Sequence, residues 1–352
     1  MSGIGRPRPG DAATGLRAMS NWIARLDAMP RLALITHPTP LTLAPRLSAT
    51  LGGPEFWFKR DDLLPVAFGG NKVRSLDLIV ADALREGADT LVTGAGPLSN
   101  HVRASAGVTA LAGLHCVAIY WGVEPARVEG NHSLTRLLGA EIRFTRDPDR
   151  ASVDGSIEAT AALIRAKGGK PYCVPRGGAC PLGALAHALA VRETLDQCRH
   201  LGIEPQVVIM AVGGAATLAG WLLGTALFGA PWRLEAVTVS RPAAEVWSRA
   251  LSLAAEAAAM IDYPPNLHSV EAIVHDGFLG DGYGLPTPEG QAAIAATARA
   301  EGVFLDPTYT GKAMAGYCKL LSQGQFADAD AALFLHTGGT PSLFTAAVEG
   351  MS

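Results

Sequence analysis

The feature that most constrains the fold of this chain is a repeated alternation of short apolar segments with longer amphipathic ones. Residues 90–93 are predicted to form a buried strand, and residues 100–112 the helix that follows it. Strands are then expected at 116–121, 141–145 and 172–174, and helices at 133–138 and 156–166. Because strands separated by helices pair in parallel through right-handed crossovers, this pattern predicts an α/β fold.

A second run of the same kind fills the rest of the chain. Its expected strands are 207–212, 234–240 and 331–336, and its expected helices are 183–199, 217–228, 243–260, 289–301, 311–321 and 341–349. Before the first run we expect a helix at 21–26, a strand at 56–59 and a helix at 73–86, and we expect 262–288 to be irregular. The 352 residues suffice for one large domain or two ordinary ones.

The composition excludes several classes of protein. A net charge of −3 gives no sign of nucleic-acid binding or of a basic membrane contact. The five cysteines are scattered and none forms a CxxC pair, which predicts reduced thiols in a cytoplasmic protein and no metal site. The first fifteen residues lack the apolar segment of a signal peptide, and no stretch is long and apolar enough for a membrane span.

The stretch from Phe58 to Arg103 contains a lysine in an unusual place. Lys72 follows Gly69, Gly70 and Asn71 at the start of an expected helix. Adjacent glycines let the backbone approach a bound group closely, and a lysine delivered there suits a Schiff base or a contact with an anion. The alternative is a solvated lysine at the start of a helix.

A second candidate binding element is the turn after the strand at 207–212. The sequence there is Gly213, Gly214, Ala215, Ala216 and Thr217, followed by a helix. Free backbone N–H groups at a helix N-terminus favour an anion such as a phosphate. An ordinary strand-to-helix turn is the other interpretation.

The motifs together resemble a known family. They are KRDD (59–62), FGGNKVR (68–74), ADTLVT (88–93), SNHVR (99–103), GDGYGLPTPEG (280–290), LDPTYTGKAMAG (305–316) and HTGGTP (336–341). In these segments the chain resembles the D-cysteine desulfhydrase and aminocyclopropane-carboxylate (ACC) deaminase family of fold-type-II enzymes that depend on pyridoxal 5'-phosphate (PLP). The likeness runs from about residue 38 to the end of the chain.

The resemblance implies an architecture like that of the tryptophan synthase β-subunit, with two parallel-sheet, three-layer domains and the active site between them. The large PLP-binding domain would be residues 1–74 together with 181–352, and the small inserted domain would be 75–180. The resemblance also implies a homodimer that acts on a small amino-acid substrate.

The resemblance implies roles for particular residues. Lys72 would form the Schiff base with PLP and move the substrate α-proton. The cofactor would be held by Asn71, Asn100, Gly213, Gly214, Ala215, Ala216, Thr217, Thr310 and Thr337. The substrate would meet Ser99, Asn100 and His101, whose N–H groups suit a carboxylate. Tyr283 and Tyr309 match two family tyrosines that face the cofactor, and Tyr309 could act as an acid or base.

This chain departs from the family pattern at several of these places. Ala215 and Ala216 stand where glycines are expected, and Ser75 replaces a lysine that contacts the phosphate in the family. Leu98 replaces a glutamine beside the substrate carboxylate. Arg176 follows a strand at a glycine-rich loop, so it would bind an acidic substrate group or lie at the surface or between domains.

Thr310 and Thr337 distinguish the two main subfamilies. ACC deaminases carry glutamate and leucine at the matching positions, whereas D-cysteine desulfhydrases carry threonine at both. A hydroxyl cannot stabilise a protonated pyridine ionically, so the weaker electron sink suits loss of a good β-leaving group. We therefore expect α,β-elimination from an amino acid such as D-cysteine, β-chloroalanine or a sulfonated analogue. The alternatives are an ACC deaminase and a PLP-binding protein without turnover.

Overall fold

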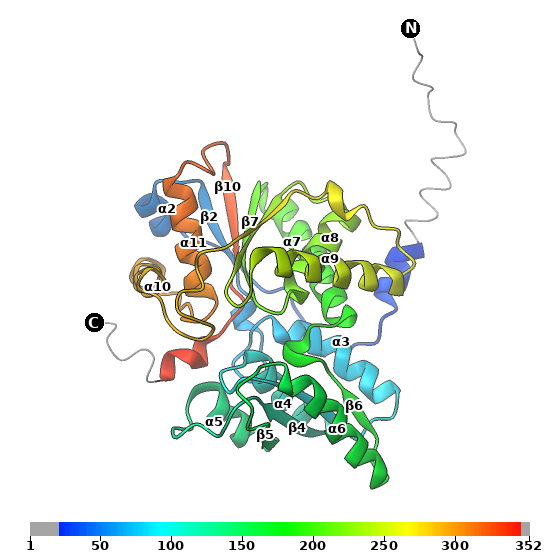
Figure 1. Ribbon diagram of the computed structural model, residues 1–352. Helices are drawn as coiled ribbons and strands as arrows, with labels where there is room; N and C mark the ends of the chain where they lie inside the picture. Colours follow the sequence, from blue (N-terminus) through cyan, green and yellow to red (C-terminus); the bar gives the residue numbers. More distant parts are fainter. Residues whose placement is uncertain (1–20, 346–352) are drawn as a thin grey trace.

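The computed structural model describes residues 21–345, and its strands form two sheets (Figure 1). The larger sheet has six strands in the order β1-β2-β10-β7-β8-β9, and the smaller has four in the order β5-β4-β3-β6. All neighbouring strands are parallel except β1 and β2. The α/β class with parallel sheets is thereby confirmed, with one antiparallel strand at the edge.

The strands of the larger sheet are β1 (Leu41–Leu43), β2 (Glu55–Lys59), β7 (Val207–Val212), β8 (Arg233–Thr238), β9 (Ala272–His275) and β10 (Ala331–Leu335). Its helices are α2 (Pro45–Leu51), α7 (Pro181–Leu201), α8 (Ala216–Phe228), α9 (Ala243–Met260), α10 (Pro288–Glu301) and α11 (Thr310–Ser322). In β7, alternate side chains point to opposite faces: Val208 and Met210 pack with α7, α8 and α9, whereas Val207 and Ile209 pack with α10 and α11. The sheet is therefore covered on both faces, as Figure 1 shows.

The smaller sheet consists of β3 (Thr90–Ala95), β4 (His115–Tyr120), β5 (Glu141–Phe144) and β6 (Pro171–Cys173). The helices α3 (Lys72–Arg85), α4 (Asn100–Ala112), α5 (Gly130–Leu137) and α6 (Ser152–Ala166) accompany it. Since this sheet uses only chain between β2 and β7, we propose 75–180 as the small domain and 1–74 with 181–352 as the large one.

Three expectations from the sequence need correction. Residues 262–288 are not wholly irregular, because β9 forms there and pairs with β8 as the edge strand of the larger sheet. Helix α2 was not anticipated. The last element is a short 3-10 helix, η4 (Thr340–Phe344), and the remainder of the expected helix 341–349 lies outside the described residues. The apolar segment 218–228 is the buried core helix α8, as expected.

Between residues 21 and 345, no helix combines the length and apolarity that crossing a bilayer requires.

Candidate active site

A cavity of about 310 Å³ lies where the carboxyl ends of strands from both sheets meet. Its lining includes Gly213 directly after β7, Trp121 directly after β4 and Ala95 at the end of β3. Open parallel sheets bind their ligands at this edge because the loops after the strands converge there. The cavity is thus built by residues from the large and the small sheet together.

Lys72 is the first residue of α3 and lines this cavity. Gly70 has φ +99°, and a Cβ at this position would lie 3.0 Å from the Thr337 carbonyl oxygen. Only glycine lets the loop pack this closely against the chain after β10, where the Asn71 N–H donates to the Thr337 carbonyl at 3.0 Å. The glycine pair therefore fixes the start of α3 and aims its lysine into the cavity.

The amine of Lys72 has one hydrogen-bond partner among the described residues. Its Nζ donates to the carbonyl of Gly177 at 3.3 Å. Burial lowers its pKa from 10.5 to about 8, and the nearby Cys180 opposes this shift slightly. Burial is therefore the main cause of the lowered pKa of Lys72. An amine that is neutral part of the time near pH 7 can act as a nucleophile and as a base.

The loop between β7 and α8 offers an anion site. Gly213 and Gly214 line the cavity, and Ala215 adopts the left-handed conformation with φ +73° at the N-cap of α8. The first N–H groups of a helix have no partner within it, so those of α8 are available to an anion. A Cβ at Gly213 would approach the Tyr309 ring to 3.1 Å, so this turn accepts no larger residue without movement.

The phosphate of PLP fits this loop, and the aldehyde of PLP fits the amine of Lys72. Thr217 adds a hydroxyl that accepts a hydrogen bond from Asn71 Nδ2 at 2.9 Å, which ties the loop to the residue before Lys72. The cavity thus contains both contacts that PLP requires: a loop for an ionic contact with the phosphate and an amine for a covalent bond with the aldehyde carbon.

Ser75 does not line the cavity, and this position of α3 supplies no lysine to the loop between β7 and α8. The Ser75 hydroxyl lies 3.3 Å from Nε2 of His187, which in turn lies 3.4 Å from the Thr217 hydroxyl. Burial and the nearby Lys72 lower the pKa of His187 to about 3, so this imidazole is neutral. A chain of neutral hydrogen bonds therefore supports the loop where the family has a positive charge.

The residues proposed to hold a substrate carboxylate line the cavity at the start of α4. Ser99 is the N-cap, and its hydroxyl accepts from the Val102 N–H at 3.3 Å. The side-chain Oδ1 of Asn100 accepts a hydrogen bond from Asn131 Nδ2 at 3.0 Å. Burial, followed by Lys72, lowers the pKa of His101 to about 3, which agrees with giving it no proton-transfer role.

Leu98 lies outside the cavity lining. A Cβ built at Gly284 would come within 3.3 Å of Leu98 Cδ1, so the side chain packs toward the GYG loop. Its carbonyl oxygen accepts a hydrogen bond from Asn131 at 2.8 Å. Leu98 therefore lies beside the loop that carries Tyr283, and its contact with a substrate stays a prediction.

Tyr283 and Tyr309 both line the cavity and contact each other. Their hydroxyl oxygens are 2.6 Å apart, and their rings pack edge to face with centroids 6.0 Å apart. Burial raises the pKa of both phenols, and the neighbouring Tyr283 raises that of Tyr309 further. The pair is thus protonated at neutral pH and is suited to donate hydrogen bonds or a proton.

The two threonines differ in their surroundings. Thr337 lines the cavity, whereas Thr310 is fully buried at the start of α11. The Thr310 hydroxyl donates to the Asp306 carboxylate at 2.8 Å and accepts from the Asp306 N–H at 2.7 Å. The structure therefore commits the Thr310 hydroxyl to Asp306, and only Thr337 faces the cavity as expected.

Arg176 lines the cavity and is not a simple surface residue. It belongs to the 3-10 turn η2 (Arg176–Gly178) and forms an ion pair with Asp154 at 3.1 Å, with 18% of its side chain exposed. Three further arginines, Arg150, Arg241 and Arg249, also line the cavity. Sequence reasoning missed these three, although Arg241 shortly follows β8, where a site residue is expected.

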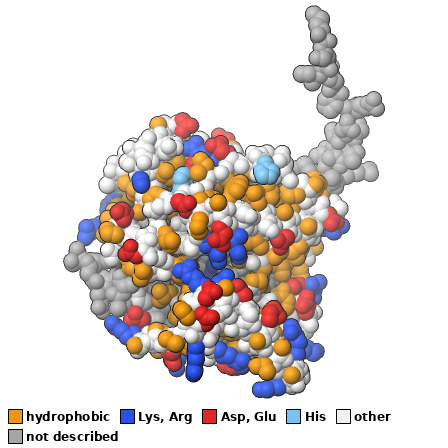
Figure 2. Space-filling view, viewed as in Figure 1, with side chains coloured by type: hydrophobic (Ala, Val, Ile, Leu, Met, Phe, Trp, Pro, Cys, Tyr) orange, Lys and Arg blue, Asp and Glu red, His pale blue; other side chains and the backbone are white. Residues whose placement is uncertain are grey.

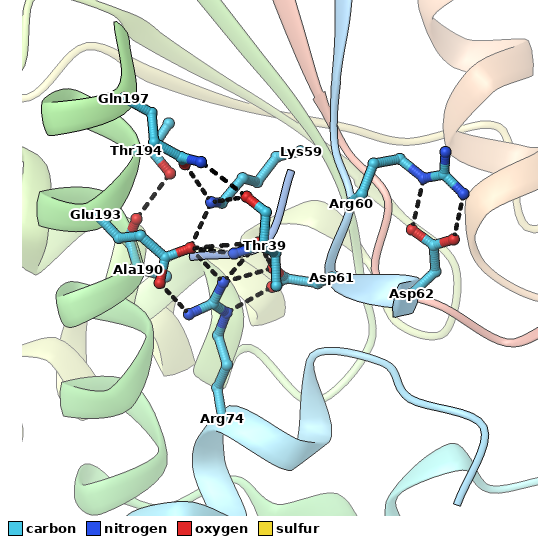
Figure 3. Close-up of polar contacts among 10 residues, drawn as sticks. All are labelled: Thr39, Lys59, Arg60, Asp61, Asp62, Arg74, Ala190, Glu193, Thr194 and Gln197. Atoms are coloured by element: carbon cyan, nitrogen blue, oxygen red, sulfur yellow. Dashed lines mark hydrogen bonds and ion pairs between the residues drawn. The ribbon is translucent and has the colours of Figure 1, made fainter. Parts of the chain in front are cut away.

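A buried ion network lies next to the cavity at the base of α3 (Figure 3). Arg74 donates to Asp61 at 2.7 Å and to Glu193 at 2.9 Å, and Lys59 also pairs with Glu193. Burial alone would raise the pKa of Asp61, but Arg74 holds it below its ordinary value. The network joins β2, α3 and α7, and it accounts for Asp61 as a structural residue.

The pyridoxal-phosphate dependent enzyme family model matches residues 32–338 of the chain. The D-cysteine desulfhydrase of Salmonella choleraesuis (strain SC-B67) is 42% identical over 329 residues, which are 91% of this chain and 97% of that protein. The D-cysteine desulfhydrase of Salmonella typhi is 41% identical over the same shares. A crystal structure of an ACC deaminase homologue superposes with a TM-score of 0.85 at 31% identity, covering 92% of this chain and 96% of that one.

Proposed function

Because the chain belongs to the pyridoxal-phosphate dependent enzyme family, we propose that it is a carbon–sulfur lyase that removes the β-substituent of a small amino acid, with D-cysteine as the reference substrate. The cofactor is pyridoxal 5'-phosphate. The observation that carries the proposal is Lys72, a cavity lysine with a pKa of about 8 that lies beside an anion-binding loop.

When bound, the cofactor withdraws electrons from the substrate α-carbon, which weakens the Cα–H bond. The α8 loop and Thr217 would hold its phosphate, and Lys72 would hold its aldehyde carbon. The N–H groups at the start of α4 would bind the substrate carboxylate. Held in this way, the substrate would present its Cα–H bond to the Lys72 amine.

The proposed elimination balances without any external oxidant or reductant. Lys72 takes the α-proton, the Cβ–S bond breaks, and sulfur leaves with the bonding pair as thiolate. Water then releases ammonia from the three-carbon product and leaves pyruvate. Tyr283 and Tyr309 are protonated and both line the cavity. They are therefore a source of a hydrogen bond or a proton for the leaving group.

Deamination of ACC is the second candidate, because the superposed crystal structure is that of an ACC deaminase homologue. Thr337 argues against it, since this residue faces the cavity with a hydroxyl where those enzymes have leucine. The carboxylate near Thr310 is Asp306, which is engaged by the N–H groups of residues 308–310. A Thr310→Glu substitution would place a second carboxylate against Asp306.

We also propose that the protein is cytoplasmic and forms a homodimer. The five cysteines are unpaired, which supports a reducing compartment. Light scattering of the purified protein would give the oligomeric state directly, and a monomer would contradict the dimer.

The test of the proposed function is product analysis with the PLP-loaded protein. D-cysteine should yield sulfide, ammonia and pyruvate in equal amounts, and ACC should yield little or no ammonia. Lys72→Ala should yield none of these products. If the loaded protein releases ammonia only from ACC, the deaminase is the correct function. If it acts on no amino acid tested, a binding protein without turnover is favoured.

A further inference from the structure

The cavity carries more positive charge than its own residues neutralise. Its lining contains Lys72 and four arginines but a single acidic residue, Asp154. Arg176 pairs with Asp154, and Arg241 pairs with Glu245. Within residues 21–345, neither Arg150 nor Arg249 has an acidic partner at ion-pair distance. Figure 2 shows Lys and Arg side chains gathered around a hollow near the middle of the visible face.

The arginines come from both domains and converge on one region. Arg150 and Arg176 belong to the small domain, whereas Arg241 and Arg249 lie after β8 and on α9. Arg150 lies over the rings of Tyr283 and Trp121, with its guanidinium carbon 4.8 and 5.6 Å from their centroids. Arg176, Arg241 and Arg249 line the same cavity. Burial lowers the pKa of Arg176, Asp154 opposes this shift, and the charges of Arg241 and Arg249 add to it.

The phosphate of the cofactor does not account for this cluster of arginines. The cofactor phosphate has its own cradle in the α8 loop, which uses backbone N–H groups and Thr217. Arg176 lies next to Gly177, whose carbonyl accepts from Lys72, so the cluster extends to the neighbourhood of the reacting amine. A second anion close to the substrate would relieve the repulsion among the arginines, because guanidinium groups bind oxyanions through paired hydrogen bonds.

We infer that, given the proposed lyase activity, the preferred substrate is an amino acid whose β-substituent is itself a tetrahedral oxyanion, a sulfonate or a phosphate ester. Arg176 and Arg249 bind that group, and Arg150 and Arg241 complete the positive field around it. A sulfhydryl such as that of D-cysteine gives Arg150 and Arg249 no anionic partner, and within residues 21–345 neither has an acidic one. The arginines thus set the substrate class, and Lys72 supplies the chemistry.

The same elimination serves this substrate without a further reagent. Lys72 takes the α-proton, the bond from Cβ to sulfur or oxygen breaks, and the substituent leaves with the bonding pair as sulfite or phosphate. Water then releases ammonia and leaves pyruvate. The arginines favour the step because they stabilise the negative charge that the departing group takes with it.

The test compares kcat/KM for both enantiomers of alanine β-sulfonate, O-phosphoserine, β-chloroalanine and cysteine. We expect one oxyanionic substrate to exceed β-chloroalanine, a neutral substrate with a good leaving group, by at least about tenfold. Arg176→Gln and Arg249→Gln should each lower the ratio of oxyanionic to neutral kcat/KM by about tenfold to a hundredfold. The sulfonate and phosphate arms show which oxyanion the cavity accepts.

Asp154→Asn gives a change of the opposite sign. Removing this exposed carboxylate frees Arg176, so the ratio should rise by about threefold to fivefold. Arg199→Gln is the matched control, because Arg199 is 69% exposed on α7, has Asp196 as its one acidic partner among the described residues and lies outside the cavity lining. It should leave the ratio where it is in the unaltered protein.

Two results would overturn the inference. The first is a ratio that stays constant in both arginine variants and in Asp154→Asn. The second is a loss of PLP affinity in the arginine variants equal to their loss of activity, which would assign the cluster to the cofactor phosphate. Calorimetric binding of alanine β-sulfonate and of serine to the loaded protein separates this inference from the proposed function. Tighter sulfonate binding that depends on Arg176 supports the inference even in a protein that eliminates nothing.

Discussion

Lys59 and Lys72 are two lysines of neighbouring segments with opposite surroundings. Lys59 is fully buried, and its Nζ donates to Glu193, to Gln197 at 2.6 Å and to the Thr39 carbonyl at 2.9 Å (Figure 3). Lys72 lines the cavity and donates only to the Gly177 carbonyl at 3.3 Å among the described residues. Burial lowers the pKa of both amines, but only Lys59 has carboxylates beside it that oppose the shift.

The difference separates structural charge from functional charge. A buried charge that is paired and hydrogen-bonded on every side holds segments together, and it has no capacity left for a ligand. An amine whose pKa lies near neutral pH, in a cavity and without an acidic partner beside it, is neutral part of the time and can react. The same reasoning separates Arg74, whose fork is filled by Asp61 and Glu193, from the arginines of the cavity.

The strongest way to break this comparison is Lys72→Ala. We expect elimination activity to fall by at least about a thousandfold, because the group that carries the cofactor and moves the proton is lost. The free energy of unfolding of the cofactor-free protein should fall by no more than about 1 kcal/mol, since one long hydrogen bond is lost and the cost of burying the charged amine is removed with it. Steady-state rates and urea unfolding measure the two quantities, and an unfolded variant would contradict the account.

The complementary change is Arg74→Met in the buried network. We expect a loss of about 3–5 kcal/mol in the free energy of unfolding, because Asp61 and Glu193 would be left without their main cation. Arg85→Met is the control, since its side chain is 64% exposed and pairs with Asp82 one turn earlier on the same helix. The control should change stability by less than about 0.5 kcal/mol. Equal urea midpoints for the two variants would sink the claim that the network is structural.

The pH dependence of cofactor loading sharpens the comparison further. Only the neutral amine attacks the aldehyde, so the loading rate of the apo-protein should rise with pH. With a pKa of about 8 the rise from pH 7 to pH 9 is about tenfold and then levels off. An ordinary lysine would show a rise of about a hundredfold over that range without levelling. Stopped-flow absorbance after mixing with PLP distinguishes the two profiles.

The same pKa shift has a consequence for stability. Between about pH 8 and the ordinary lysine pKa of 10.5, the unfolded chain binds more protons at this residue than the folded chain does. Stability therefore rises with pH across this window, as far as Lys72 contributes. The Lys72→Ala variant should lack this rise, and urea midpoints at the two ends of the window would reveal it.

The smallest expected effect concerns Ser75. Ser75→Ala removes a hydroxyl that contacts His187 and so weakens support of the α8 loop at Thr217. We expect a loss of about 0.5–1.5 kcal/mol in stability, with a rise in the dissociation constant of PLP of fivefold or less, about 1 kcal/mol. Thermal unfolding and fluorescence titration with PLP provide the two values. A PLP affinity loss above a hundredfold would show that Ser75 contacts the phosphate directly.

The sequence was sufficient for the features that depend on local pattern. The strand–helix alternation predicted the α/β class, because apolar strands between helices have few other packings. The glycine pair before Lys72 predicted a close approach to a bound group, and in the structure the close approach that Gly70 makes is to the Thr337 carbonyl of the chain itself. The edge strand β9 was missed because its apolar run is only three residues long, Ala272 to Val274, and lies within a long irregular segment.

The features that depend on tertiary contact were not predictable. The Thr310 hydroxyl is captured by Asp306, and no spacing rule identifies which of several nearby groups a hydroxyl will bond. Arg150 and Arg249 come from a loop and a helix without any motif, and only the folded chain brings them together with Arg176. Leu98 directly precedes the SNHVR motif, and its packing toward Gly284 joins it to a segment almost two hundred residues away in the chain.

The most direct test of the central claim is to locate the lysine that carries the cofactor. Borohydride reduction of the loaded protein fixes pyridoxyl phosphate to the amine that holds it, and peptide mass spectrometry then identifies that residue. We predict one label per chain, on Lys72, with Lys59 unlabelled. A label on Lys59 or on any other lysine, or no label on a protein saturated with PLP, would contradict it.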